Sequence, residues 1–77
     1  MRKSILIASK LHFEALIEKH RINVETLLQK GVGVAEHPDI MDTIEKELGI
    51  VAEYDDKLNV LKKYFMEGEN KKEVLNG

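Results

Sequence analysis

Two histidines and two glutamates near the middle of the first half are the side chains best suited to bind a metal ion. They are His12, Glu14, Glu18 and His20. Ligands on one face of a helix need a spacing of three or four residues. The histidines are eight residues apart, with Leu16 between them, and the two glutamates share a face that is rotated away from both. We therefore interpret the histidines as solvated or partly buried side chains, and the sequence predicts no metal and no cofactor.

Nucleophilic and acid–base chemistry finds equally little support. Four hydroxyl side chains are present: Ser4, Ser9, Thr26 and Thr43. None has a histidine and an acid at a workable helical spacing. Asp55 and Asp56 form a carboxylate pair in sequence, but adjacent helical positions point about 100° apart and do not share a site. The sequence predicts no catalytic residue, and we expect a protein that is not an enzyme.

The glycines Gly31 and Gly33 resemble the opening of a phosphate-binding loop. Such a loop needs a preceding strand and usually a lysine or serine after it, and both are absent. Glu36 and Asp39 would also repel a phosphate. A connecting loop explains both glycines better.

That loop is the main break in the chain, because it holds the only proline and two of the five glycines. It separates two long helical patterns, at about residues 4–30 and 38–66. Gly31 is expected to end the first helix, and Pro38 suits the first turn of the second. Pro38 also favours an extended His37 at the N-cap. Ser4 is the expected N-cap of the first helix.

Residues 1–68 are therefore predicted to form an all-α, antiparallel two-helix hairpin with a turn at 31–37. Residues 69–77 are predicted to be a disordered tail. Apolar residues recur at three- and four-residue steps on one broad face of each helix. The predicted core and interface residues are Phe13, Leu16, Ile17, Val24, Leu27, Ile44, Leu48, Val51, Leu58, Leu61 and Phe65. Leu6 and Ile7 extend the first stripe backwards.

A turn centred near Val34 pairs residues whose numbers add to about 68. His20 then lies near Leu48, and basic residues of the first helix lie beside acidic residues of the second. Within the second helix, Gly49 conflicts with helix formation. Either the helix bends there, or another backbone packs close to it.

Composition excludes several classes of protein. The chain has 77 residues and no cysteine, so neither a disulfide nor a thiolate metal site can form. The net charge is −2, and residues 31–57 carry two basic and eight acidic side chains. This argues against a nucleic-acid surface, and stabilisation of a helix end explains the acidity better than an acidic binding patch does. No apolar run approaches the length of a membrane span or a signal core. We expect a cytoplasmic protein.

Two stretches of the sequence resemble those of other proteins: Gly31 to Ile40 and Ile50 to Leu58. The first contains the pattern Val-Gly-x-x-Glu-His-Pro-Asp, and the second leads to Lys63-Tyr64-Phe65. Over about residues 18–65 the chain resembles small uncharacterised helical proteins of tailed phages of marine bacteria. The resemblance implies a viral origin and a setting in the host cytoplasm or the virion, but no catalytic residues.

The function expected from these observations is self-association. A two-helix hairpin covers only one stripe of each helix, and 43% hydrophobic residues is more than that stripe needs. The expected partner is a second copy, most simply in a four-helix bundle. The alternative is a small regulator that docks its apolar helical face on a host or viral protein.

Overall fold

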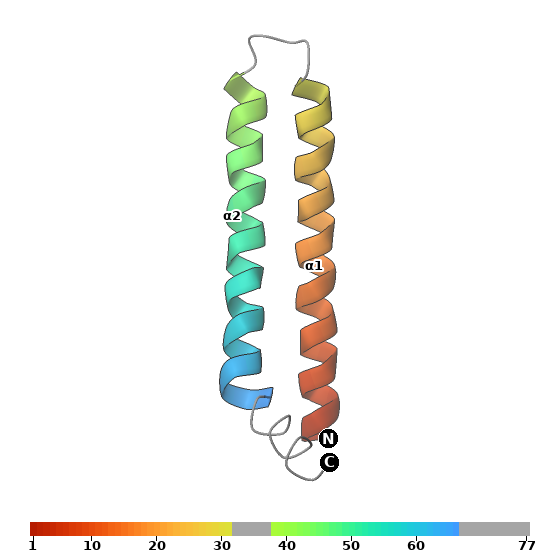
Figure 1. Cartoon of the computed structure of the whole chain (residues 1–77). Helices are drawn as coiled ribbons and strands as arrows, with labels where there is room; N and C mark the ends of the chain where they lie inside the picture. Colours follow the sequence, from red (N-terminus) through yellow and green to blue (C-terminus); the bar gives the residue numbers. More distant parts are fainter. Residues whose placement is uncertain (32–37, 67–77) are drawn as a thin grey trace, which may run out of the picture.

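The computed structural model describes residues 1–31 and 38–66, and these residues are almost entirely helical. Helix α1 spans Arg2–Gly31 and helix α2 spans Pro38–Leu61. A short π-helical segment, η1, continues from α2 over Lys62–Met66. Figure 1 shows α1 and α2 side by side and antiparallel. The all-helical prediction is confirmed for the part of the chain described.

The ends of the helices follow local chemistry. Pro38 is the first residue of α2, where its missing N–H leaves no helical hydrogen bond unmade. Asp39 lies in the first turn of α2 and Lys30 in the last turn of α1, each with the charge that the helix dipole favours. Gly31 is the last residue of α1. The other two predicted turn residues, Gly33 and His37, lie outside the described residues, as does the predicted tail at 69–77.

The predicted N-cap of the first helix is wrong. Helix α1 begins two residues before Ser4, and the N–H of Ile5 donates to the Met1 carbonyl oxygen at 3.1 Å. Ser4 is therefore the third residue of the helix and lies within its first turn, so it is not the N-cap residue. Leu6 makes the first core contact of α1, whereas its neighbours Ile5 and Ile7 are exposed.

Three contacts between the helices define their register. The Arg2 guanidinium donates to the Phe65 carbonyl oxygen at 3.2 Å. The rings of Phe13 and Tyr54 stack with centroids 6.0 Å apart, and His20 hydrogen bonds to Glu47. In each pair the residue numbers add to 67, one less than the expected sum.

That one-residue difference places Glu47, rather than Leu48, opposite His20. Adjacent helical positions are about 100° apart, so turning Glu47 towards α1 turns Leu48 away from it. Leu48 is 52% exposed, and it does not belong to the core of the single hairpin.

The π-helical segment turns Phe65 away from the contact between α1 and α2, so its predicted role as a core or interface residue is not met within the single hairpin. In a continuous α-helix Phe65 would lie seven residues, or nearly two turns, after Leu58 and on the same face. The π-helix has i→i+5 hydrogen bonds and more residues per turn, so Phe65 does not return to that face. It is 52% exposed.

The core of the hairpin is very small. Among the residues whose side chains the structure describes, only Leu6 and Leu58 are buried apolar residues, each 8% exposed. Most other predicted core residues are half-buried along the contact line: Phe13, Leu16, Ile17, Val24, Leu27, Ile44, Val51 and Leu61. Two helices alone enclose little volume, because each has only one neighbour.

Candidate interaction surface

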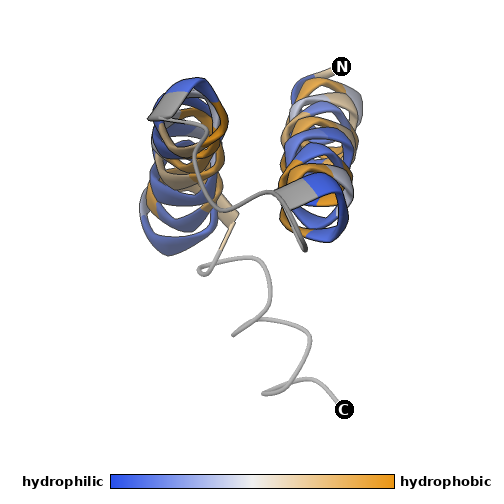
Figure 2. Ribbon diagram, turned by 90° about the horizontal axis from the view of Figure 1, so that it is seen from above, coloured by the Kyte–Doolittle hydropathy of each residue, from blue (hydrophilic) through white to orange (hydrophobic). Residues whose placement is uncertain are grey.

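The surface of the hairpin carries many apolar side chains. Over the described residues, eleven large hydrophobic residues are at least 42% exposed: Met1, Ile5, Ile7, Leu11, Ile22, Leu28, Met41, Leu48, Val60, Tyr64 and Phe65. In the view down the hairpin, apolar segments are not confined to the sides of the helices that face each other (Figure 2). Single exposed apolar residues are common on protein surfaces, whereas a cluster of them marks a candidate interaction site.

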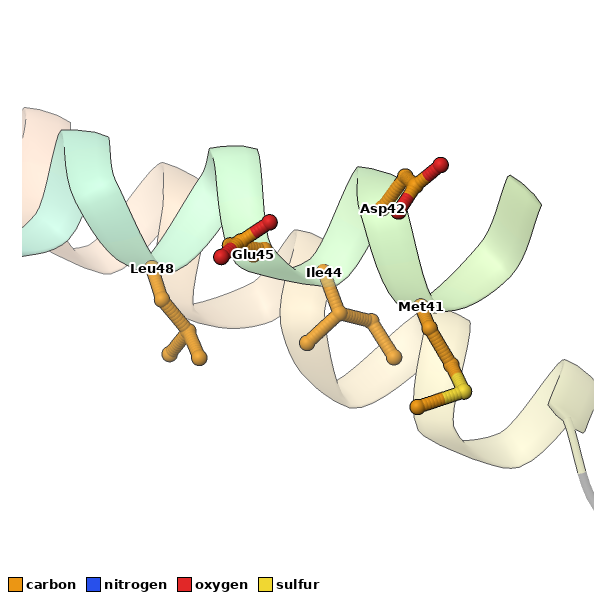
Figure 3. A pocket seen from close by; sticks show the side chains of 5 residues that line it. All are labelled: Met41, Asp42, Ile44, Glu45 and Leu48. Carbon is orange, nitrogen blue, oxygen red and sulfur yellow. The ribbon is translucent and has the colours of Figure 1, made fainter. Parts of the chain in front are cut away.

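One cluster of apolar side chains lies on one side of α2, near its first residue. Met41, Ile44 and Leu48 line a shallow depression together with Asp42 and Glu45. Figure 3 shows the three apolar side chains pointing to the same side of α2, with the two carboxylates away from them. Met41 is 73% exposed, more than any other large hydrophobic residue beyond Met1. The depression is an apolar surface with a charged edge, which suits a protein contact better than a small ligand.

The opposite flank is different in chemistry. Near the turn it has a shallow depression lined largely by polar side chains, among them Asn23 and Lys30 of α1 and Thr43 and Glu47 of α2. The Thr43 hydroxyl donates its hydrogen to the Asp39 carbonyl oxygen at 2.7 Å, so that hydrogen is not available to a ligand in this depression. A second depression nearer the chain ends is lined by Phe13, Asp56, Lys57, Val60, Leu61 and Phe65. Of its apolar lining residues, Phe13 and Leu61 are half-buried along the contact line, whereas Val60 and Phe65 are exposed.

A polar contact sits inside the helix interface. The side chains of His20 and Glu47 are only 15% and 17% exposed, and the His20 Nδ1 atom lies at a Glu47 carboxylate oxygen. The hydrogen bond from His20, reinforced by one from Asn23, lowers the pKa of Glu47, although its partial burial acts in the opposite direction. His20, one of the side chains considered as a metal ligand, therefore joins the two helices by a hydrogen bond.

Within residues 1–31 and 38–66, the other ion pairs join residues of the same helix. The Arg21 guanidinium donates to both carboxylate oxygens of Glu18, at 2.9 and 3.1 Å, which lowers the pKa of Glu18 and raises that of Arg21. Lys10 lies 4.0 Å from Glu14. Lys57 lies 3.8 Å from Glu53, one turn earlier in α2. Arg21 and Lys10 thus have acidic partners about one turn away in their own helix, whereas Lys19 acts on Glu47 across the hairpin and helps to lower the pKa of Glu47.

The space around Gly49 is open on the side where a side chain would lie. No heavy atom lies within 4 Å of the position that a Cβ atom would occupy there. Of the two explanations for this glycine, close packing of another backbone does not occur within the hairpin.

Two important residues carry weaker signals in the sequence. Leu6 is one of the two buried residues, yet the sequence gives it only as an extension of the apolar stripe. Its spacing of seven residues from Phe13 is the signal that assigns it to the core. Tyr54 stacks on Phe13 and also lies under the Lys57 ammonium, 5.0 Å from the ring centroid. An aromatic pair across a helix interface cannot be read from one sequence.

Over residues 1–31 and 38–66, no group of three or more His, Cys, Asp or Glu side chains is arranged to hold a metal ion. Neither helix in these ranges combines the length and apolarity that crossing a bilayer requires. Comparison with protein-family models, with curated proteins and with solved structures found no match to the chain.

Proposed function

We propose that this protein is a non-enzymatic helical module that self-associates and serves as an interaction or structural element. One observation carries the proposal. The described part of the hairpin buries two apolar side chains and leaves eleven large ones at least 42% exposed. Domains of this size are marginal even with a complete core, and no disulfide is available to compensate.

Association supplies what the single hairpin lacks. Each fully covered Leu, Ile or Met side chain contributes about 1.5–3 kcal/mol relative to an exposed one. Covering three or four of them on each copy would add a stabilisation comparable to the whole stability of a small domain, about 5 kcal/mol or more. A four-helix bundle of two hairpins is the simplest arrangement that does this.

The mass in solution tests the proposal. Sedimentation equilibrium across the micromolar range is expected to give a dimer or a higher oligomer that dissociates on dilution. A well-folded monomer throughout that range would refute self-association.

A second candidate is a small regulator that docks on a host or viral protein. Its support is the spacing of Met41, Ile44 and Leu48, which matches the anchors of a helix that binds in a groove. An exposed methionine also adapts readily to different partners. A folded monomer would favour this candidate, and a pull-down from infected or expressing cells would then identify the partner. Under either candidate, a viral origin and a host-cytoplasm setting follow as proposals from the resemblance of the turn sequence.

A further inference from the structure

One flank of the hairpin carries an apolar surface in the half near the turn. We call it the turn-proximal flank: Val24, Leu28, Met41, Ile44, Leu48 and Val51. Leu28, Met41 and Leu48 are 49%, 73% and 52% exposed. The other three are half-buried at the edge of the contact line. In α2 the members follow each other at steps of three, four and three residues, the heptad spacing of packed helices.

Helix geometry places the two helices' members on the same flank. His20 and Glu47 mark the sides that face each other. Each residue turns a helix by about 100° in a fixed direction. In that direction, Leu48 lies about 100° around α2 from Glu47. Leu28, eight residues after His20, lies about 80° around α1 from it. In two antiparallel helices lying side by side, that direction leads to the same flank.

The opposite rotation provides a check. Asn23 and Thr43 lie about 60° and 40° from His20 and Glu47 in the other sense. They line one shared depression, as two residues on a common flank should.

The whole side of the hairpin that includes this flank has the area of a dimer interface. The 24 residues of α2 extend about 36 Å, and two helices side by side are about 20 Å wide. A face of about 700 Å² per copy is close to the ~800 Å² that each partner buries in a stable complex. The apolar members occupy the turn half of this face.

The distribution of apolar and charged residues also selects an orientation. Towards the chain ends, the same flank carries Lys10 of α1 and Asp55 of α2, each again about 80° from the facing side. If the two turns were at opposite ends of a dimer, Leu48 would meet the Asp55 region of the other copy. If the turns are at the same end, α1 of each copy lies on α2 of the other. Leu28 then faces Met41, and Lys10 faces Asp55 of the second copy.

We infer that a second copy of this chain covers the turn-proximal flank, with a two-fold axis along the helices and both turns at one end. The inference rests on the proposed self-association and adds the face and the orientation. All neighbouring helices in this bundle are antiparallel, as short-loop bundles favour.

The face is tested with Leu48→Lys, and the matched control is Leu11→Lys. Leu11 is similarly exposed, at 58%, but lies about 180° from the facing side of α1. Leu48→Lys is expected to raise the dimer dissociation constant by about tenfold or more, whereas Leu11→Lys leaves it unchanged. Circular dichroism shows that each variant is still helical, and Leu48→Ala replaces Leu48→Lys if the lysine variant unfolds.

The outcomes separate the inference from the proposed function. A monomeric parent protein refutes self-association itself. A dimeric parent that tolerates Leu48→Lys but is dissociated by Leu11→Lys keeps self-association and overturns the choice of face.

The orientation is tested by disulfide formation, for which the absence of cysteine is an advantage. Leu28→Cys and Met41→Cys are mixed, allowed to exchange subunits and oxidised. A mixed disulfide is expected, and none is expected when Leu11→Cys replaces Leu28→Cys. A dimer that forms no mixed disulfide between Leu28→Cys and Met41→Cys would overturn the orientation.

Discussion

At the scale of single residues, His20 and Glu47 decide how the helices are rotated. A partly buried carboxylate is costly unless it is hydrogen bonded, and Glu47 has His20 and Asn23 as partners. Moving the register by one residue would separate these groups and bring Leu48 into the interface. The contact therefore fixes the rotation that leaves Leu48 exposed.

Glu47 also predicts a dependence of stability on acid. Its pKa is lowered in the folded protein from an ordinary value of 4.5. Its contribution is thus complete above about that pH and is lost as the pH falls through the lowered pKa. Urea titrations of Glu47→Gln at pH 7 and at about pH 3 should show a smaller loss of stability on acidification than the parent shows. Glu45→Gln, an exposed carboxylate two residues away, is the control and should behave as the parent does. Equal acid sensitivity in Glu47→Gln and the parent would contradict the prediction.

Gly49 predicts a stabilising substitution. A glycine inside a helix costs about 1 kcal/mol relative to alanine, and a Cβ at this position meets no atom of the chain within 4 Å. Gly49→Ala is therefore expected to raise the free energy of unfolding by about 0.5–1 kcal/mol, measured by urea denaturation. A destabilised Gly49→Ala variant that also dissociates would show that another chain packs against Gly49.

At the scale of the elements, the positions of the helices could be predicted from the sequence, but their rotation could not. Glycine and proline are concentrated at residues 31–38, so two long helices and one connection follow directly from the chain. Apolar residues in both helices, however, extend beyond the sides that face each other, so their pattern does not select one rotation. The choice between them depends on Glu47, Asn23 and the Phe13–Tyr54 stack, which are side-chain contacts between distant residues.

The end of α2 shows a second limit of prediction. Periodicity extends the second helix to about residue 66, and helical structure does reach Met66. The change to π-helical hydrogen bonds at Lys62 has no signal in the composition of Lys62–Met66. The contact of Arg2 with the Phe65 carbonyl oxygen accompanies it, and that contact joins residues 63 positions apart.

Leu58 provides the clearest test of the helix packing. It is 8% exposed, and truncation of a buried leucine to alanine typically costs about 2–5 kcal/mol. Leu58→Ala should lower the free energy of unfolding by that amount in a thermal or urea melt. Leu11→Ala, at an exposed leucine, should stay within about 0.5 kcal/mol of the parent. Similar melts for the two variants would mean that the core is assigned to the wrong face.

At the scale of the whole molecule, folding and association are expected to be coupled. Ligand or partner binding to the folded state alone raises its stability with concentration. The melting temperature of the parent should therefore rise as the protein concentration is increased, whereas that of Leu48→Lys should change little. Differential scanning calorimetry over the micromolar range measures both. A melting temperature independent of concentration in the parent would indicate that the hairpin is stable alone.

The positions of Leu6 and Leu58 have a further consequence for backbone exchange with solvent. Both buried residues lie in the half of the hairpin that contains Arg2 and Phe65, away from Gly31 and Pro38. Amides around them should exchange with deuterium only when the whole hairpin opens, while amides around Val24 and Ile44 open locally. Deuterium uptake near the turn should then slow as the protein is concentrated, and uptake near Leu6 and Leu58 should follow global stability. The two halves of each helix would thus report different events: local opening at the contact between the two chains near the turn, and global unfolding around Leu6 and Leu58.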